Sequence, residues 1–248
     1  MSKISIDLGS IKSALTEIGY DISDCIEREN NGTNWQLKFH NSGAIVTIYD
    51  TNTKKNTVVN GKCDADEKVS LKEIVDGLKC KELSIDPLNH IIVSYVNSKQ
   101  EACHYDFKQE WHSAGKDADL LHDILCLANN TDNVDAFLII GVNDAYEVPG
   151  VTEWRKSNEL FDYLRSKKFA GNRIPDIQLH KLYYKHRKID VIEIKSSKNV
   201  PFFLAEKYRD VGVQIYTRVG DTNTPKNECA NYNDVEALWR IHFARENE

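Results

Sequence analysis

Two acidic residues and a lysine lie close together in the stretch EACHYDFK. Glu101 and Asp106 are five positions apart, and Lys108 follows two positions later. A third acid, Asp144, comes just after the apolar run AFLIIGV. Carboxylates supply the hard oxygen ligands that Mg²⁺ or Mn²⁺ prefers, and a nearby lysine can contact a phosphate oxygen. These residue types therefore suit metal-dependent phosphodiester chemistry.

The spacing of Glu101 and Asp106 sets a structural condition for such a site. Side chains five positions apart on a regular strand point to opposite faces of the sheet. The two carboxylates can meet only if a bulge or a strand end intervenes. Taken alone, the spacing favours a plainer interpretation, in which both acids are solvated strand residues and Asp144 belongs to a turn.

Three histidines lie near these acids, namely His104, His112 and His122. His112 would suit the role of a general base. A single histidine in a polar loop is more often solvated, however. His122 falls on the polar side of a predicted helix, so we expect a structural or exposed side chain.

A basic and aromatic group surrounds a predicted turn between two strands. Lysine and arginine contact phosphates, and unpaired bases stack on aromatic rings. An ordinary charged hairpin turn with strand tyrosines is the alternative, and the pattern favours it. The group comprises Lys181, Tyr183, Tyr184, Lys185, His186, Arg187 and Lys188.

Arg218 lies in the apolar segment VQIYTRVG. An arginine in such a segment needs an anionic partner, either a protein carboxylate or a substrate phosphate. Asn223 and Thr224 follow in a turn whose backbone N–H groups could face an anion. The predicted nucleic-acid contacts are Arg218, Tyr184, Lys185, Arg187 and Lys188.

Residues 1–88 predict a small α+β domain of helix, antiparallel sheet and helix. A helix is predicted at 10–18, and a second at 70–78 begins with a capping box of Ser70 and Glu73. Three short strands are predicted between them, at 35–40, 44–49 and 56–61. This order weakly resembles half of a TATA-binding-protein-like domain, and an unrelated α+β module explains it equally well.

Residues 89–248 predict a second, mixed α/β domain, so the fold class is α+β. The predicted strands are 91–96, 136–142, 177–184, 189–195 and 213–220. The predicted helices are 117–129, with Asp117 as its cap, 156–168 and 233–243.

Four blocks within residues 95–245 resemble the Schlafen-type AlbA_2 domain family: EACHYDFK, DILCLANN, FLIIGVND and IYTRVGDTNTPKN. The resemblance implies a domain that acts on nucleic acid. In nuclease members, three acids bind a divalent metal and cut RNA, notably transfer RNA. By this resemblance Glu101, Asp106 and Asp144 would be catalytic ligands of Mg²⁺ or Mn²⁺, and Lys108 would contact phosphate.

Two departures from the family pattern concern the same blocks. The second acid is Asp106 where the pattern has Glu, which shortens the ligand by one methylene. Asn129–Asp132 replaces the paired glycines that usually follow the helix. The ATP-binding label also given to this family finds no support, because the chain has no Walker lysine loop.

Composition narrows the function classes. The net charge of −6 and the pI of about 5.8 do not indicate a basic nucleic-acid-binding domain, although they allow a local basic patch. The six scattered cysteines lack zinc-site spacing, and we expect reduced thiols. No apolar run reaches the length of a membrane span, so we expect a cytoplasmic protein that does not bind membranes.

The predicted function is metal-dependent endoribonuclease activity on a structured RNA such as transfer RNA. A homodimer is expected, because a single domain of this size covers little of a transfer RNA. Two alternatives stay open. One is a non-catalytic DNA- or RNA-binding module of a regulator, and the other is a protein-interaction subunit, which the net acidity favours.

Overall fold

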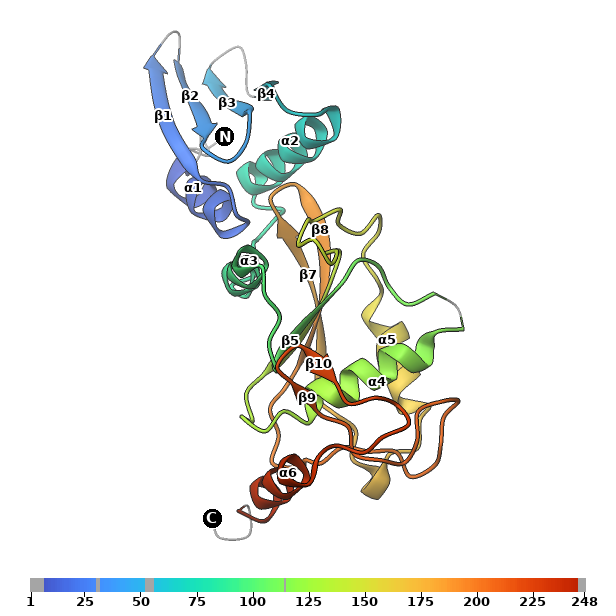
Figure 1. Ribbon diagram of the computed structural model, residues 1–248. Helices are drawn as coiled ribbons and strands as arrows, with labels where there is room; N and C mark the ends of the chain where they lie inside the picture. The colour runs from blue at the N-terminus through green and yellow to red at the C-terminus, as the bar shows by residue number, and fades with distance from the viewer. Residues whose placement is uncertain (1–6, 30–31, 52–55, 114, 245–248) are drawn as a thin grey trace. The chain divides into compact units, whose positions relative to one another are not determined.

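The computed structural model describes residues 7–29, 32–51, 56–113 and 115–244. It combines helices with antiparallel and mixed sheets, which confirms the predicted α+β class (Figure 1). The chain forms two compact units. The first comprises Met1–Ser94 with Leu182–Arg187, and the second comprises Tyr95–Lys181 with Lys188–Glu248. The likeness of the N-terminal part to a TATA-binding-protein-like domain stays a prediction.

An antiparallel sheet in the order β1-β2-β3-β4 forms the centre of the first unit. Its strands are β1 (Ile22–Glu29), β2 (Gly32–Phe39), β3 (Ala44–Thr51) and β4 (Thr57–Gly61). The last three agree with the predicted strands. We did not predict β1, because its sequence ISDCIERE is mostly polar, and none of its residues is fully buried.

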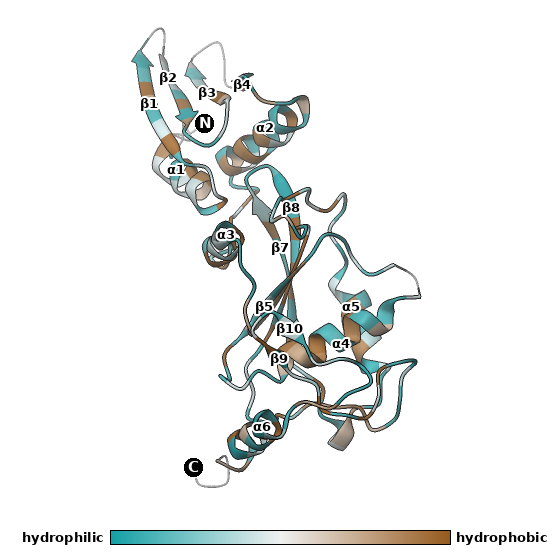
Figure 2. Ribbon diagram, in the orientation of Figure 1, coloured by the Kyte–Doolittle hydropathy of each residue, from teal (hydrophilic) through white to brown (hydrophobic). Residues whose placement is uncertain are grey.

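Two helices, α1 (Leu8–Glu17) and α2 (Ala65–Cys80), bury apolar stripes in the core that the sheet also lines (Figure 2). The predicted capping box at Ser70 is wrong, because α2 begins five residues earlier. Asp64 is the N-cap residue, and its Oδ1 accepts the backbone N–H of Glu67 at 2.6 Å. A capping carboxylate satisfies one of the unpaired N–H groups at a helix start, so Ser70 falls inside the helix.

The predicted strand at 91–96 is also wrong, because Asn89–Ser98 form helix α3. Its apolar residues Ile92 and Val96 are buried with helical spacing. The Asn89 side chain is buried, and it exchanges two hydrogen bonds with the backbone of Tyr183. Packing therefore overrides the strand preference of a segment rich in β-branched residues.

The second unit contains a four-stranded sheet in the order β5-β6-β8-β7. Its strands are β5 (Tyr105–Lys108), β6 (Ala136–Ile140), β7 (Ile177–Tyr184) and β8 (Arg187–Ile194). β5 and β6 are parallel, whereas β6 and β8 are antiparallel. All five residues of β6 are buried, as the continuous apolar run predicted.

Helix α4 (Asp117–Ala128) connects the parallel strands β5 and β6 and lies almost wholly inside the second core. A parallel pair needs such a crossover connection. Asp117 does not cap this helix as predicted. Lys116 is the N-cap without a side-chain bond, and the Asp117 carboxylate instead pairs with Arg209 at 2.5 Å.

The rest of the second unit comprises α5 (Ser157–Arg165), the short 3₁₀ helix Ala170–Asn172, β9 (Arg218–Val219), β10 (Thr222–Asn223) and α6 (Tyr232–Ala244). The predicted strand at 213–220 shrinks to the two residues of β9. Two of its backbone groups bond to side chains instead of a neighbouring strand: Asn129 donates to the Tyr216 carbonyl at 2.9 Å, and Thr217 N–H donates to Thr224 Oγ1 at 3.1 Å. Among the described residues, no helix has the length and apolar character to cross a membrane.

Candidate functional site

A tight turn before β5 brings Glu101 beside Asp106. Ala102 and Tyr105 pair across this turn, and the N–H of each donates to the carbonyl of the other at 3.3 Å. Glu101 and Asp106 are the next opposed pair, one residue farther from the turn on each side. Opposed residues of an antiparallel pair have their side chains on the same face. The strand end that their spacing requires is therefore present.

The guanidinium of Arg218 holds both acids. Its Nη2 donates to Glu101 Oε2 at 2.6 Å and to Asp106 Oδ1 at 3.2 Å. Its Nε donates to the carbonyl of Ala102 at 3.0 Å, so the same side chain also fixes the turn. The anionic partner expected for Arg218 is thus a pair of protein carboxylates.

Lys108 and Asp123 extend this contact into a closed ring of side chains. The Lys108 ammonium lies 2.5 Å from Asp106 Oδ2 and 3.7 Å from Asp123 Oδ2. Asn223 then completes the ring, because it donates to Asp123 Oδ1 at 2.8 Å and accepts from Arg218 Nη1 at 2.9 Å. Five side chains from β5, α4, β9 and β10 therefore hold one another in place.

Asp144 reaches the same region from the end of β6. The parallel pairing aligns Lys108 with Ile140, so both strands end at one edge of the sheet. The N–H of Gly141 bonds to the Lys108 carbonyl at 2.8 Å. Gly141 has φ of +113°, and an added Cβ would lie 3.1 Å from the Cα of Gly150, so the sharp exit of the chain requires glycine here.

The loop that carries Asp144 is built around Asn143. The Asn143 side-chain oxygen accepts the N–H of Ala145 at 3.0 Å and that of Glu147 at 2.9 Å. This arrangement leaves Asp144 exposed at the loop tip. Within the described residues, its carboxylate has no hydrogen bond or ion pair, so it is available to a ligand.

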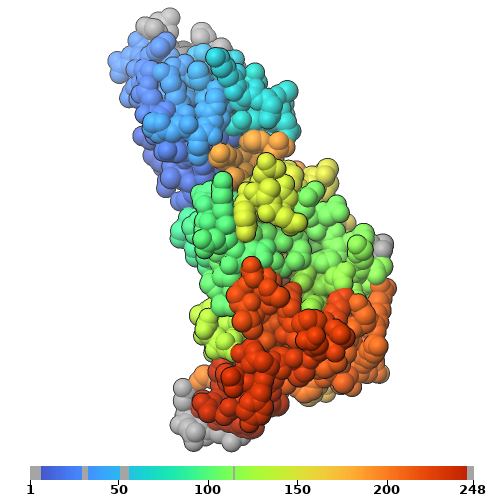
Figure 3. Space-filling model, in the orientation of Figure 1, coloured from blue at the N-terminus to red at the C-terminus, as the bar shows by residue number. Residues whose placement is uncertain are grey.

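These residues line an open pocket of about 390 Å³. The lining has an excess of negative charge. Its two cations are Lys108 and Arg218, and its four acids are Glu101, Asp106, Asp144 and Asp221. Segments far apart in the sequence lie side by side on this unit's surface, as the green and red regions of Figure 3 show. The lining residues are Glu101, Asp106, Phe107, Lys108, Gln109, Asp144, Arg218, Asp221, Thr222 and Asn223.

Burial and charge shift the pKa values of three groups at this site. Burial, followed by the charge of Asp106, raises the pKa of the Glu101 carboxyl. Burial opposes the charged form of Lys108, but the Asp123 and Asp106 carboxylates outweigh it and raise the Lys108 pKa. Burial likewise opposes ionisation of Asp123, but His112 and Lys108 outweigh it and lower that pKa. The ring therefore favours charged Lys108 and charged Asp123.

The three histidines lie in different surroundings. His112 Nε2 lies 3.3 Å from Asp123 Oδ2, and His112 is not among the residues that line the pocket. His122 is buried and contacts the Thr224 carbonyl at 2.9 Å, which agrees with the structural role that was one of the two expectations. His104 lies in the turn before β5 and packs edge-to-face on Tyr105.

Two residues of the ring were missed or underrated in the sequence. Asp123 belongs to the helix DADLLHDILCLA, where a polar residue among buried apolar neighbours is a usable signal. Asn223 was expected to present a turn to an anion, but its side chain bridges Arg218 and Asp123. Its neighbour Thr224 uses its N–H on the Thr217 carbonyl at 2.9 Å, so that group is not free for a substrate.

The basic candidates on the β7–β8 hairpin already have protein partners. Lys185 donates to the carbonyl of Asn41 at 3.1 Å, and Arg187 forms an ion pair with Asp66. These two candidates lie in the first unit.

The remaining hairpin candidates are Lys188 and Tyr184. The Lys188 ammonium lies 4.8 Å from the ring centroid of Trp154, in the second unit. Tyr184 is partly buried in the first unit. None of the four hairpin candidates lines the acidic pocket, whereas Arg218 does. Their role in nucleic-acid binding stays a prediction.

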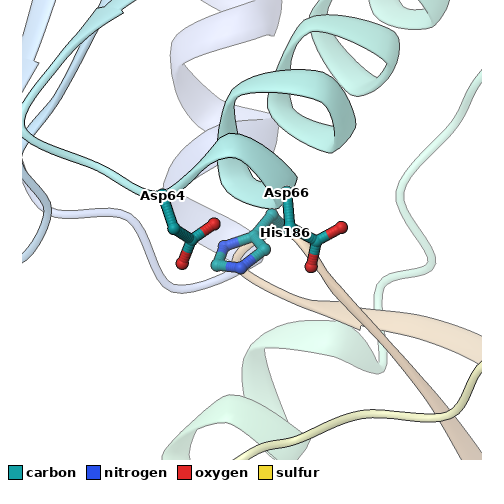
Figure 4. A group of neighbouring side chains, drawn as sticks. All are labelled: Asp64, Asp66 and His186. Atoms are coloured by element: carbon teal, nitrogen blue, oxygen red, sulfur yellow. The ribbon is translucent and has the colours of Figure 1, made fainter.

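A different cluster, in the first unit, has its possible metal-ligand atoms close enough together to bind one ion. Among the described residues, only Asp64, Asp66 and His186 offer ligand atoms that all lie within 4.8 Å of one another (Figure 4). Glu101, Asp106 and Asp144 share a pocket but are more widely spread.

Comparison with known proteins addresses the second unit. The family model "Schlafen, AlbA_2" matches residues 101–227, which is half of the chain. The match includes every residue of the ring described above. A search of curated proteins finds no significant match. This domain suggests a function related to nucleic acid. The chain belongs to the Schlafen AlbA_2 domain family.

Proposed function

We propose that this protein is a metal-dependent endoribonuclease that cleaves a structured RNA such as transfer RNA at the acidic pocket. The observation that carries the proposal is the turn at Cys103 and His104, which sets Glu101 beside Asp106. Without that turn, the two acids would lie on opposite faces of a strand. With it, they share one pocket with Asp144 and Lys108.

The pocket fits a hard divalent cation in donor type and charge. Its acids offer oxygen ligands, which suit Mg²⁺ or Mn²⁺. Arg218 donates one hydrogen bond to Asp106 Oδ1, and Lys108 donates one to Asp106 Oδ2. Each carboxylate oxygen can accept a further bond, so both can still contact a cation. An RNA phosphate would also be repelled by the uncompensated acids unless a cation lay between them.

Each residue of the site has a role in this proposal. Glu101, Asp106 and Asp144 would hold the cation, and Arg218 keeps the first two in register. When bound, the metal would lower the pKa of a water molecule and neutralise charge on the phosphate. Lys108, whose charged form the ring favours, would contact a non-bridging phosphate oxygen.

The test is a cleavage assay on total transfer RNA with the full chain, in Mg²⁺ or Mn²⁺ and in EDTA. The decisive variant is Asp144→Asn, since this exposed carboxylate has no hydrogen bond or ion pair within the described residues and its loss should leave the fold intact. Asp162→Asn, an exposed acid on α5, is the matched control. We expect metal-dependent fragments with wild type and Asp162→Asn, and none with Asp144→Asn.

A second candidate function is a non-catalytic nucleic-acid-binding module. The observation that favours it is the closed ring, in which Arg218 and Lys108 already compensate Glu101, Asp106 and Asp123. Intact RNA in every condition, together with a salt-sensitive gel shift, would support this function and reject the nuclease. The absence of both RNA cleavage and a gel shift would support a protein-interaction subunit.

A further inference from the structure

A cluster of metal-ligand side chains lies in the first unit and shares no residue with the acidic pocket. Asp64 and Asp66 stand at the start of α2, and His186 comes from the tip of the β7–β8 hairpin. Figure 4 shows the imidazole between the two carboxylates in this view. One ligand atom from each side chain lies within 4.8 Å of the other two. His186 is distant in sequence from the two acids, so the fold itself brings it to them.

The imidazole of His186 is held by the protein yet keeps acceptor capacity. Only 11% of its side chain is exposed. Its Nδ1 lies 3.5 Å from the Tyr20 hydroxyl and 3.8 Å from Glu67 Oε1. Its Nε2 is buried and has no hydrogen-bond partner among the described residues. A buried ring nitrogen without a partner is costly unless a ligand satisfies it.

Glu67 supports His186 through the Tyr20 hydroxyl, which lies 3.5 Å from Nδ1, because Glu67 Oε1 itself is 3.8 Å from Nδ1 and too far for a direct hydrogen bond. Its Oε1 accepts the Tyr20 hydroxyl at 3.0 Å and the Ser42 hydroxyl at 2.7 Å, so this carboxylate is fixed beside the imidazole. A carboxylate on one side of a histidine orients the ring and increases its basicity towards a metal. The cluster therefore has both ligands and an outer partner.

The two carboxylates each keep one oxygen for a cation. Asp64 uses Oδ1 to cap α2, and Asp66 uses Oδ2 on Arg187. Their other oxygens, Asp64 Oδ2 and Asp66 Oδ1, have no side-chain hydrogen bond or ion pair within the described residues. Two carboxylates also outweigh the single charge of Arg187, so the local charge balance favours a cation.

We propose that Asp64, Asp66 and His186 bind a divalent transition-metal ion of the Zn²⁺ class. Mixed imidazole and carboxylate ligands suit Zn²⁺ and its neighbours in the first transition row, whereas Mg²⁺ takes oxygen ligands alone. Three protein ligands leave a coordination position for water. The ion would join the start of α2 to the hairpin tip and stabilise the first unit. This site is independent of the proposed nuclease function.

The test is a calorimetric titration of the tag-free full chain with Zn²⁺, supported by visible absorption with Co²⁺. We expect one Zn²⁺ per chain at this site, and a Zn²⁺-dependent rise in Tm. His186→Gln and Asp64→Asn should weaken Zn²⁺ binding by more than about 100-fold, since loss of even a supporting outer partner costs 10–100-fold. Asp64→Asn is informative because asparagine still caps a helix, so α2 should keep its start.

Two matched variants make the result decisive. His40→Gln removes an exposed histidine of the same unit and should bind Zn²⁺ as wild type does. Asp144→Asn should also keep Zn²⁺ binding, which separates this site from the acidic pocket. Binding that survives both His186→Gln and Asp64→Asn, or that His40→Gln abolishes equally, would overturn the proposal. So would the absence of Zn²⁺ binding by wild type.

Discussion

Arg218 Nη2 lies 3.2 Å from Asp106 Oδ1, and only 3% and 4% of these two side chains are exposed. The pair joins the end of the family domain to the strand near its start, 112 positions earlier. Charged groups so deeply buried persist only where each is compensated. Arg218 therefore supports the site by holding Asp106 and Glu101 in register.

Replacing Arg218 by methionine should destabilise the second unit. The change leaves Asp106 and Glu101 close together without their shared cation, and breaking a buried ion pair costs about 3–5 kcal/mol. Urea denaturation of the purified chain measures the free energy of unfolding. Arg165→Met, at an exposed position of α5, should change it by less than about 0.5 kcal/mol. Equal changes in the free energy of unfolding for the two variants would show that the buried ion pair does not stabilise the second unit.

Asp123 should make stability depend on pH in the acid range. Burial opposes its ionisation, but His112 and Lys108 outweigh burial and hold its folded-state pKa below the ordinary value. Its contribution is therefore complete above the unfolded-state pKa of about 3.9 and is lost as the pH falls through the lower folded-state pKa. We expect the stability difference between wild type and Asp123→Asn to be largest near neutral pH and to shrink below about pH 4.

The check on Asp123 is a series of denaturation curves between pH 7 and pH 2.5. Asp162→Asn, which changes an exposed acid, should differ from wild type by a small amount throughout this range. A gap between wild type and Asp123→Asn that widens on acidification would contradict the assigned direction of the Asp123 shift.

Lys108 should contribute one phosphate contact to RNA binding. Its side chain is 30% exposed and lines the pocket, and its charged form is favoured by Asp123 and Asp106. We expect Lys108→Gln to weaken binding similarly for different RNA sequences and to reduce the slope of log affinity against log salt by about one. Filter binding at several salt concentrations measures both quantities. Lys207→Gln, at an exposed lysine outside this pocket, should leave the slope unchanged.

The turn before β5 should tolerate no change of length. Inserting one glycine between Cys103 and His104 would shift Glu101 out of its position opposite Asp106. We expect this insertion to abolish RNA cleavage as completely as Glu101→Ala does, while the urea unfolding transition stays cooperative. Cleavage by the insertion variant at the wild-type rate would show that the pairing of Glu101 with Asp106 is not required.

Local patterns predicted much of the second unit correctly. The apolar run in β6 and the amphipathic stripe of α4 depend on neighbouring residues alone, so both could be read directly. The candidate residues Glu101, Asp106, Lys108, Asp144 and Arg218 could be named from residue type and resemblance, and all five line one pocket. Their metal-binding and catalytic roles stay predictions.

Other features depended on contacts that no local pattern contains. The segment at 91–96 is rich in β-branched residues, yet Asn89 anchors it as a helix through bonds to Tyr183, 94 positions away. The segment at 213–220 reads as a strand, yet the Asn129 side chain occupies the carbonyl of Tyr216. In both cases long-range packing, of which these hydrogen bonds are part, outweighed a local preference of the backbone.

The sequence by itself determined which acids and cations this protein has available and placed most of them at the ends of predictable elements. Only the tertiary structure decided which of them meet. Arg218 selected Glu101 and Asp106 as its partners, Asn223 connected it to Asp123, and His186 came beside Asp64 and Asp66. Hydrophobic periodicity relates residues only a few positions apart, whereas these contacts depend on how whole helices and strands pack. The packing must pair the charges it buries, because an unpaired buried charge is strongly destabilising.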